Sequence, residues 1–153
     1  MNRIKIIDLG FLDYKNSWNY QKELQKKVLI GDCSDSIIFV EHDSVYTFGK
    51  NSDKSNLLVS KDSKIKIYET ERGGEITYHG PGQIVCYPIL NLKNFKQSVT
   101  WYMRALEQVI IETLKLFNIK ATRKDGLTGV WVKDEKIGAQ GCLLYTSDAA
   151  DES

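Results

Sequence analysis

The sequence lacks the features that mark membrane and secreted proteins. No apolar run approaches the roughly 20 residues of a membrane-spanning helix, and Met1–Gly10 carries charges where a secretory signal would be apolar. Cysteine is scarce, because Cys33, Cys86 and Cys142 are an odd number without the spacing of a metal site or a CxxC motif. We therefore expect a reducing, cytoplasmic location, no membrane association and no bound metal.

An excess of charge of either sign is also missing. The 153 residues contain 21 basic and 20 acidic side chains, for a net charge of +1. Nothing in that balance argues for a nucleic-acid partner. With 42% hydrophobic and 27% charged residues, the composition is typical of an ordinary globular protein of one domain.

Helical and strand-like patterns alternate along the chain. Apolar residues at helical spacing predict one helix within Asp13–Leu29 and a second that Ser98 caps and Asn118 ends. β-branched and alternating runs predict strands at Arg3–Leu9, Ile37–Val40, Val45–Phe48, Lys64–Tyr68, Ile84–Leu90, Val130–Val132 and Lys136–Ala139. The continuously apolar run Ile37–Val40 is expected to be buried on both faces. The fold class is therefore α/β (α+β), a mixed sheet with flanking helices.

The segment Arg72–Pro88 carries the chemistry. Four glycines and a proline fall among the 11 residues from Arg72 to Gly82, more than a surface turn needs. Glycine clusters let the backbone approach a ligand with its N–H groups free to donate. Arg72, Tyr78, His79 and Gln83 are the kind of polar groups that orient a ligand in an apolar pocket. The alternative is a purely structural glycine-rich corner.

Three motifs together resemble the octanoyltransferase family. They are RGGEITYHGPGQ from Arg72, followed by Tyr87-Pro88; EHDSVYTFG at Glu41–Gly49; and GVWV at Gly129–Val132 with KIGAQG at Lys136–Gly141. The resemblance implies the fold of the biotin and lipoate protein ligases. It also implies transfer of an octanoyl (or lipoyl) group from acyl carrier protein to an enzyme cysteine, and then to a lysine of a lipoyl-domain apoprotein, without a cofactor.

The resemblance also implies roles for particular residues. Lys136 matches the lysine that acts beside the catalytic cysteine as a dyad. The residues that match the acyl pocket are Arg72, Gly73, Gly74, Glu75, Ile76, Thr77, Tyr78, His79, Ala139, Gln140 and Gly141. A thiolate attacker, an amine that takes its proton and backbone donors for the oxyanion suit a thioester substrate.

The sequence departs from the family after Gly141. The family's His-Gly-x-Ala-Leu-Asn and Pro-Cys-Gly elements do not occur, and the chain ends CLLYTSDAADES. We therefore interpret residues 1–141 as a partial domain whose sheet is incomplete at its C-terminus, and residues 142–153 as a non-native tail. Cys142 follows Lys136 by six residues, roughly 20 Å along a strand, which disfavours it as the nucleophile. Cys86, in an apolar run, is expected to be buried.

Two other functions stay open. One is an ATP-dependent lipoate or biotin protein ligase of the same fold, although the Gly-Arg-Gly-Arg-x-Gly-like loop of biotin ligases is replaced here by RGGEITYHGPGQ. The other is a non-catalytic fragment that binds an acyl chain, which the missing Pro-Cys-Gly element favours. For His42, a capping or core hydrogen-bonding role is at least as well supported as a chemical one.

Overall fold

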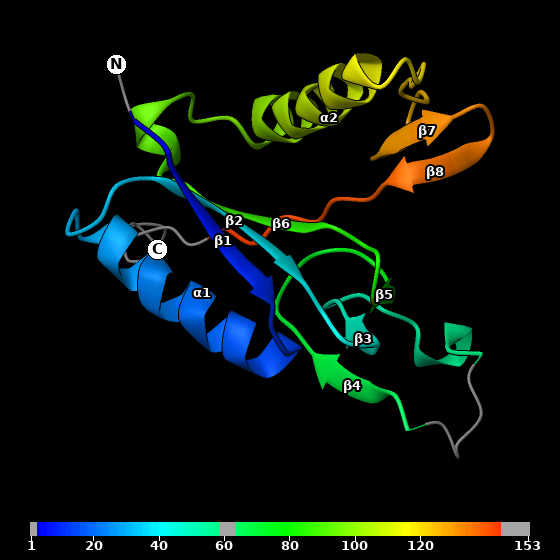
Figure 1. Ribbon diagram of the computed structural model, residues 1–153, viewed down its shortest axis with the longest axis horizontal. Helices are drawn as coiled ribbons and strands as arrows, with labels where there is room; N and C mark the ends of the chain where they lie inside the picture. Colours follow the sequence, from blue (N-terminus) through cyan, green and yellow to red (C-terminus); the bar gives the residue numbers. More distant parts are fainter. Residues whose placement is uncertain (1–2, 59–63, 145–153) are drawn as a thin grey trace, which may run out of the picture. The chain divides into compact units, whose positions relative to one another are not determined.

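The computed structural model describes residues 3–58 and 64–144 (Figure 1). The chain forms two compact units, Met1–Phe95 and Lys96–Ser153, and each is described by itself. Most of the expected non-native tail, residues 145–153, lies outside the described residues. No helix in the described ranges is long and apolar enough to span a membrane.

The first unit contains a mixed three-stranded sheet with a helix on one face (Figure 1). Its strands are β1 (Lys5–Phe11), β2 (Ser36–Glu41) and β6 (Val85–Ile89), in the order β1-β2-β6. β1 runs parallel to β2, and β6 runs antiparallel to it. Helix α1 (Tyr14–Leu29) packs Leu24 and Val28 against Ile38 of β2 to form the core.

The prediction of a helix within Asp13–Leu29 is confirmed, and the structure shows that Asp13 is its N-cap. The Asp13 side chain accepts a hydrogen bond from the Asn16 N–H at 3.0 Å, which satisfies a free donor of the first turn. Lys26 and Lys27 lie in the last turn, where their charge complements the helix dipole.

Two expectations about burial in this sheet are wrong. Phe39, in the middle of the run predicted to be buried on both faces, is 37% exposed, because β2 alternates in burial. Cys86 is exposed as well. It pairs with Phe39 and lies on the face of the sheet opposite to its buried neighbour Val85, since side chains alternate along a strand.

A second mixed sheet follows in the same unit. Its central strand is β3 (Val45–Phe48), which pairs in parallel with β4 (Lys66–Glu69) and antiparallel with β5 (Thr77–His79). Strand β5 lies inside the glycine-rich segment and was not predicted. The short 3-10 helices η1 (Lys54–Asn56) and η2 (Leu92–Asn94) complete the regular elements of this unit. The single mixed sheet expected from sequence is therefore divided, with β2 and β3 belonging to different sheets.

The second unit combines a helix with a hairpin. Helix α2 (Val99–Leu116) is capped by Ser98, as predicted, and the chain leaves it through Asn118 in the left-handed region (φ 59°). Strands β7 (Val130–Val132) and β8 (Glu135–Gly138) pair antiparallel around a turn that contains Lys133 at φ 54°. Val130 is fully buried at the start of β7.

Candidate functional site

A cluster of aromatic and histidine rings occurs in the first unit. Tyr14, the first residue of α1, has its ring centroid 5.1 Å from Tyr68 of β4, 5.4 Å from His42 and 6.1 Å from His79. His42 lies 5.9 Å from both His79 and Tyr87 of β6. Helix α1, strands β4, β5 and β6, and the residue that follows β2 thus bring together rings that are far apart in sequence. The faces of these rings form an apolar surface with polar edges.

The hydrogen bonds of His42 fix the tautomer of its neutral ring. The side chain is fully buried, and Nδ1 lies 2.7 Å from the carbonyl oxygen of Leu12, which can only accept. Nδ1–H is therefore the donor, and in the neutral ring Nε2 accepts from the Tyr87 hydroxyl at 3.0 Å. His42 is a core hydrogen-bonding residue, which agrees with the structural interpretation of its sequence position.

The tyrosine hydroxyls of the cluster stay protonated. Burial raises the pKa of Tyr14, although the positive charge of Arg72 opposes the shift. Burial also raises the pKa of Tyr87. Both phenols are therefore neutral hydrogen-bonding groups at physiological pH.

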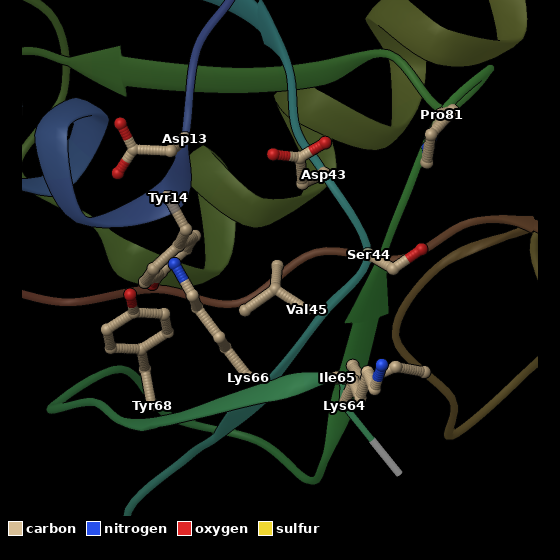
Figure 2. Close-up of a pocket in the computed structure, with 10 residues that line it drawn as sticks. All are labelled: Asp13, Tyr14, Asp43, Ser44, Val45, Lys64, Ile65, Lys66, Tyr68 and Pro81. Atoms are coloured by element: carbon tan, nitrogen blue, oxygen red, sulfur yellow. The ribbon is translucent and has the colours of Figure 1, made fainter.

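A pocket of about 360 Å³ opens beside this cluster (Figure 2). Tyr14, Tyr68 and Val45 contribute its apolar surface, and Asp13 and Lys66 contribute charges. The full set of lining residues is Asp13, Tyr14, Asp43, Ser44, Val45, Lys64, Ile65, Lys66, Tyr68 and Pro81. Its volume lies within the range of small-molecule sites, about 300–1,000 Å³.

Arg72 fastens the glycine-rich segment to β3. Its Nη2 donates to the carbonyl and the hydroxyl of buried Thr47 at 2.8 and 2.9 Å, and to the Glu75 carbonyl at 2.9 Å. Its Nη1 donates to the Gly73 carbonyl at 3.0 Å. Burial lowers the pKa of the guanidinium, but an arginine remains charged at any physiological pH. Arg72 therefore fixes the conformation of its own loop through hydrogen bonds to the loop backbone and to β3.

Two glycines allow this loop to lie directly against the end of β3. A Cβ placed on Gly49 would be 2.0 Å from the carbonyl oxygen of Gly74 and 3.1 Å from Arg72 Nη1. Lys50 N–H donates to the Arg72 carbonyl at 3.0 Å, so the two chain segments are also hydrogen-bonded. Only a residue without a side chain fits position 49 at this separation.

The other predicted pocket residues of this segment lie along β5 and the turn before it. Glu75 and Tyr78 are exposed, whereas Ile76, Thr77 and His79 are half-buried. The Tyr78 hydroxyl is 2.9 Å from the Ser44 hydroxyl. His79 Nδ1–H donates to Gln83 Oε1 at 2.9 Å, which leaves Nε2 as the acceptor of a neutral ring.

Stability should depend on the protonation of His79. Burial lowers its pKa below the usual value of 6.5, Arg72 and His42 act in the same direction, and the Gln83 hydrogen bond opposes them. The unfolded chain then binds more protons below pH 6.5, so stability is greatest above that pH. It falls as the pH drops from 6.5 through the folded-state pKa, by at most about 1.4 kcal/mol per pH unit. Urea unfolding at pH 7.5, 6.5 and 5.5 should show a flatter dependence in His79→Gln; an unchanged slope would contradict this.

The remaining predicted site residues belong to the second unit. The ammonium of Lys136, on β8, lies 5.1 Å from the centre of the Trp131 ring on β7, a cation–π distance. Ala139 and Gly141 are exposed. Gln140 Nε2 donates to the Met103 carbonyl at 3.0 Å, while its buried Oε1 has no partner among the described atoms. Burial raises the pKa of the Cys142 thiol, which disfavours the nucleophilic thiolate.

Glu107 of α2 is a buried carboxylate that sequence reasoning missed. Its side chain is 1% exposed. Oε2 accepts from Arg104 Nη1 at 2.7 Å and from Arg123 Nε at 2.8 Å, and Oε1 accepts from the Gly129 N–H at 3.0 Å. Burial raises the pKa of Glu107, but these donors outweigh it, so the pKa lies below its usual range. The more distant partners follow it by 16 and 22 residues, so no local pattern could reveal them.

No candidate metal site occurs in residues 3–58 and 64–144, where no three His, Cys, Asp or Glu side chains group suitably. The chemistry available to the described residues is therefore that of a pocket, a glycine-rich loop, two hydrogen-bonded histidines and a lysine held against an aromatic ring.

Comparison of the sequence with known proteins gives one consistent result. The family model described as the lipoyl protein ligase A/B catalytic domain matches residues 13–148. A chloroplastic octanoyltransferase, LIP2p2 of Arabidopsis thaliana, is 49% identical over 137 residues, covering 85% of this chain and 49% of the relative. An octanoyltransferase of Gloeobacter violaceus is 44% identical over 142 residues, covering 92% of this chain and 64% of the relative. The chain thus spans about half to two thirds of the length of these relatives.

Solved structures support the fold. P. falciparum LipL1 in complex with lipoate aligns with a TM-score of 0.65 at 16% identity, over 88% of this chain and 42% of that one. A putative lipoate protein ligase from T. acidophilum, Ta0514, aligns with a TM-score of 0.60 at 14% identity, over 90% and 60%. At such identities the likeness concerns the fold alone. This likeness confirms the expected fold, that of the biotin and lipoate protein ligases.

Proposed function

The chain belongs to the lipoyl protein ligase A/B catalytic domain family, and we propose that it forms the acyl-binding part of an octanoyltransferase. The proposed reaction moves an octanoyl group from acyl carrier protein to a lysine of a lipoyl-domain protein. The observation that carries the proposal is the glycine-rich loop that Arg72 fastens to β3, in the unit that also holds the aromatic pocket. The octanoyltransferase names of relatives at 44–49% identity support the same activity.

The first unit suits an acyl chain. The faces of Tyr14 and Tyr68, with Val45, give the pocket an apolar wall, against which a methylene chain can be buried. The rings of His42 and His79 lie within 6.1 Å of Tyr14 and, when neutral, add no charge to this surface. A glycine-rich loop leaves room for the ligand and offers backbone N–H groups to a carbonyl oxygen. We assign Arg72–His79 to this pocket, with Arg72 as the residue that maintains the loop.

We assign Lys136 the proton transfers. Its amine takes the proton of an attacking thiol, and the thiolate adds to the thioester carbonyl of the octanoyl carrier protein. The bond between the acyl carbon and the carrier sulfur then breaks, and the carrier thiol leaves with a proton. The amine of the target lysine next attacks the octanoyl-cysteine to form the amide and release the enzyme thiol. Ala139, Gln140 and Gly141 are assigned to the acyl pocket by their motif.

The attacking thiol is not assigned to Cys142. Burial disfavours its thiolate, and the Pro-Cys-Gly element of the family is missing from the sequence. We propose that the gene encodes this element downstream of Gly141 and that the last 12 residues are foreign to it. Genomic sequencing through the position of Gly141 tests this; an uninterrupted native frame that encodes CLLYTSDAADES would refute it.

A reconstituted transfer reaction tests the function. The product of the complete gene is incubated with octanoyl carrier protein and an unmodified lipoyl domain, with and without ATP, and all three proteins are weighed by mass spectrometry. We expect an octanoyl group on the lipoyl domain in both arms. Transfer only in the arm with ATP would instead indicate a ligase. The 153-residue chain itself should bind octanoyl thioester without acquiring an adduct. The alternative of a non-catalytic acyl-binding fragment predicts the same result. An octanoyl adduct on Cys142 would contradict our assignment.

A further inference from the structure

Glu107 joins three separate segments of the second unit. Its two carboxylate oxygens have different partners. Oε2 accepts from Arg104 and Arg123, and Oε1 accepts from the backbone N–H of Gly129. Arg123 extends the network, because its Nη2 also donates to the Arg104 carbonyl at 3.0 Å and to Gln108 Oε1 at 2.8 Å. The buried carboxylate thereby holds the residue that precedes β7 in a fixed place relative to α2.

Gly129 in turn forms the surface on which the Lys136 side chain lies. A Cβ on Gly129 would be 2.4 Å from Lys136 Cε, 2.8 Å from the Gly138 carbonyl oxygen and 3.2 Å from Lys136 Nζ. Its φ of 134° is a conformation that favours glycine. The lysine stem therefore crosses directly over the Gly129 backbone, and the ammonium reaches the ring of Trp131.

These two contacts share one peptide. The Gly129 N–H donates to Glu107, and the aliphatic part of the Lys136 side chain lies against the Gly129 Cα. A shift of this peptide therefore moves the surface against which Lys136 packs. We propose that Glu107 is a positioning residue that sets the Lys136 side chain through Gly129. The functional consequence rests on the catalytic role proposed above for Lys136, whereas the geometric coupling can be measured without it.

Glu107→Gln tests whether both oxygens of Glu107 are needed to position Gly129 and Lys136. An amide has one acceptor oxygen, whereas the carboxylate uses two. If that oxygen faces the arginines, the amide NH2 opposes the Gly129 N–H; if it faces Gly129, the NH2 opposes two guanidinium groups. Glu112→Gln is the matched control, because Glu112 lies on the same helix with a side chain that is 58% exposed, 4.0 Å from Lys115.

Nuclear magnetic resonance of the full chain provides the readout. The ε-methylene signals of Lys136, assigned by their loss in Lys136→Arg, should lie upfield because of the Trp131 ring current. We expect Glu107→Gln to move them toward the positions of exposed lysines and Glu112→Gln to leave them unchanged. Gly129→Ala, with Glu107 intact, should also displace them, and Gly126→Ala should not, because a Cβ there meets nothing within 4 Å. Unchanged Lys136 signals in a folded Glu107→Gln protein would overturn the proposal.

A second variant covers the case in which Glu107→Gln does not fold. Glu107→Asp keeps the charge but is one methylene shorter, so it cannot span the distance from the arginines to Gly129. Displaced Lys136 signals in folded Glu107→Asp support positioning, whereas unchanged signals, or loss of folding in both variants, assign Glu107 a structural role only.

The transfer assay then reports the functional consequence separately. We expect Glu107→Gln to lower kcat by up to about 10²-fold, the effect of misplacing a catalytic group by about 1 Å, with KM unchanged. Displaced Lys136 signals with unaltered kcat in an active enzyme would refute the role assigned to Lys136, while the coupling of Glu107 to Lys136 would stand.

Discussion

Replacing Lys136 with methionine is expected to lower the rate of octanoyl transfer by about 10²–10⁴-fold, the contribution typical of a positioned general acid or base. Methionine retains an unbranched apolar stem that can lie over Gly129 and reach Trp131, so the hairpin should keep its packing. It removes only the amine that would take the proton of the thiol. The rate is measured with the product of the complete gene, octanoyl carrier protein and an unmodified lipoyl domain, under single-turnover conditions.

Lys124 offers a matched control for this substitution. Its ammonium also lies against Trp131, at 5.9 Å compared with 5.1 Å for Lys136, and it pairs with exposed Asp134 at 3.2 Å. Lys124→Met should therefore remove a similar cation–π contact with less than about a threefold effect on the rate, since exposed pairs of this kind contribute little. Equal losses in the two variants would mean that the charge near Trp131 matters for structure, and that Lys136 has no special chemical role.

The elements that the sequence predicted well are those encoded by local patterns. Ser98 caps α2, as predicted, through a side-chain oxygen that accepts from the N–H group three residues ahead, a relation visible in sequence. Asn118 adopts the left-handed conformation expected of a helix stop. Strand β3 begins and ends where its apolar run does. Each of these features depends on a few neighbouring residues, so periodicity and capping chemistry sufficed.

Features that depend on distant partners were not predictable in the same way. The division into two mixed sheets depends on which strands pair across long stretches of sequence, as when β3 pairs with β5. Strand β5 is only three residues long and lies among glycines, so its pairing with β3 outweighs its weak local signal. Burial of Phe39 and Cys86 was misjudged because an apolar run does not reveal which face of its sheet is covered.

In the candidate site, too, local patterns were predictable from sequence and contacts between distant residues were not. The motif identified Arg72–His79 as one segment, but it could not show that Arg72 points back to Thr47 and to its own loop. Nor could it connect His79 to Tyr14, 65 positions earlier, whose ring is stacked against it at 6.1 Å. The motif thus identifies the segment, while the packing of the rings identifies the pocket beside it.

The close approach of Gly49 to Gly74 gives a second large expected effect. Gly49→Ala should destabilise the protein by about 1–3 kcal/mol, the usual effect of overpacking, or more if the loop cannot move. Its Cβ would meet backbone atoms, the Gly74 oxygen at 2.0 Å and the Gly74 carbonyl carbon at 2.9 Å, so no side-chain rotation relieves the clash. The loop must move away from β3, which strains the hydrogen bonds of Arg72 to Thr47. We also expect octanoyl thioester binding, measured by calorimetry, to weaken about tenfold or more, since 1.4 kcal/mol corresponds to a factor of ten.

Gly82→Ala separates this steric effect from the general consequence of adding a side chain to a glycine-rich segment. Gly82 has φ of 83°, and a Cβ there meets nothing within 4 Å, so the substitution introduces only the backbone strain of a left-handed residue, about 1–2 kcal/mol. Gly49 requires no left-handed conformation, so any loss of stability in Gly49→Ala comes from the contact with the loop. Urea unfolding of both variants measures the stability effects. Weakened acyl binding in Gly49→Ala but not in Gly82→Ala would tie the pocket to the position of the loop, whereas unchanged binding in a destabilised Gly49→Ala would show that the loop and the acyl pocket are independent.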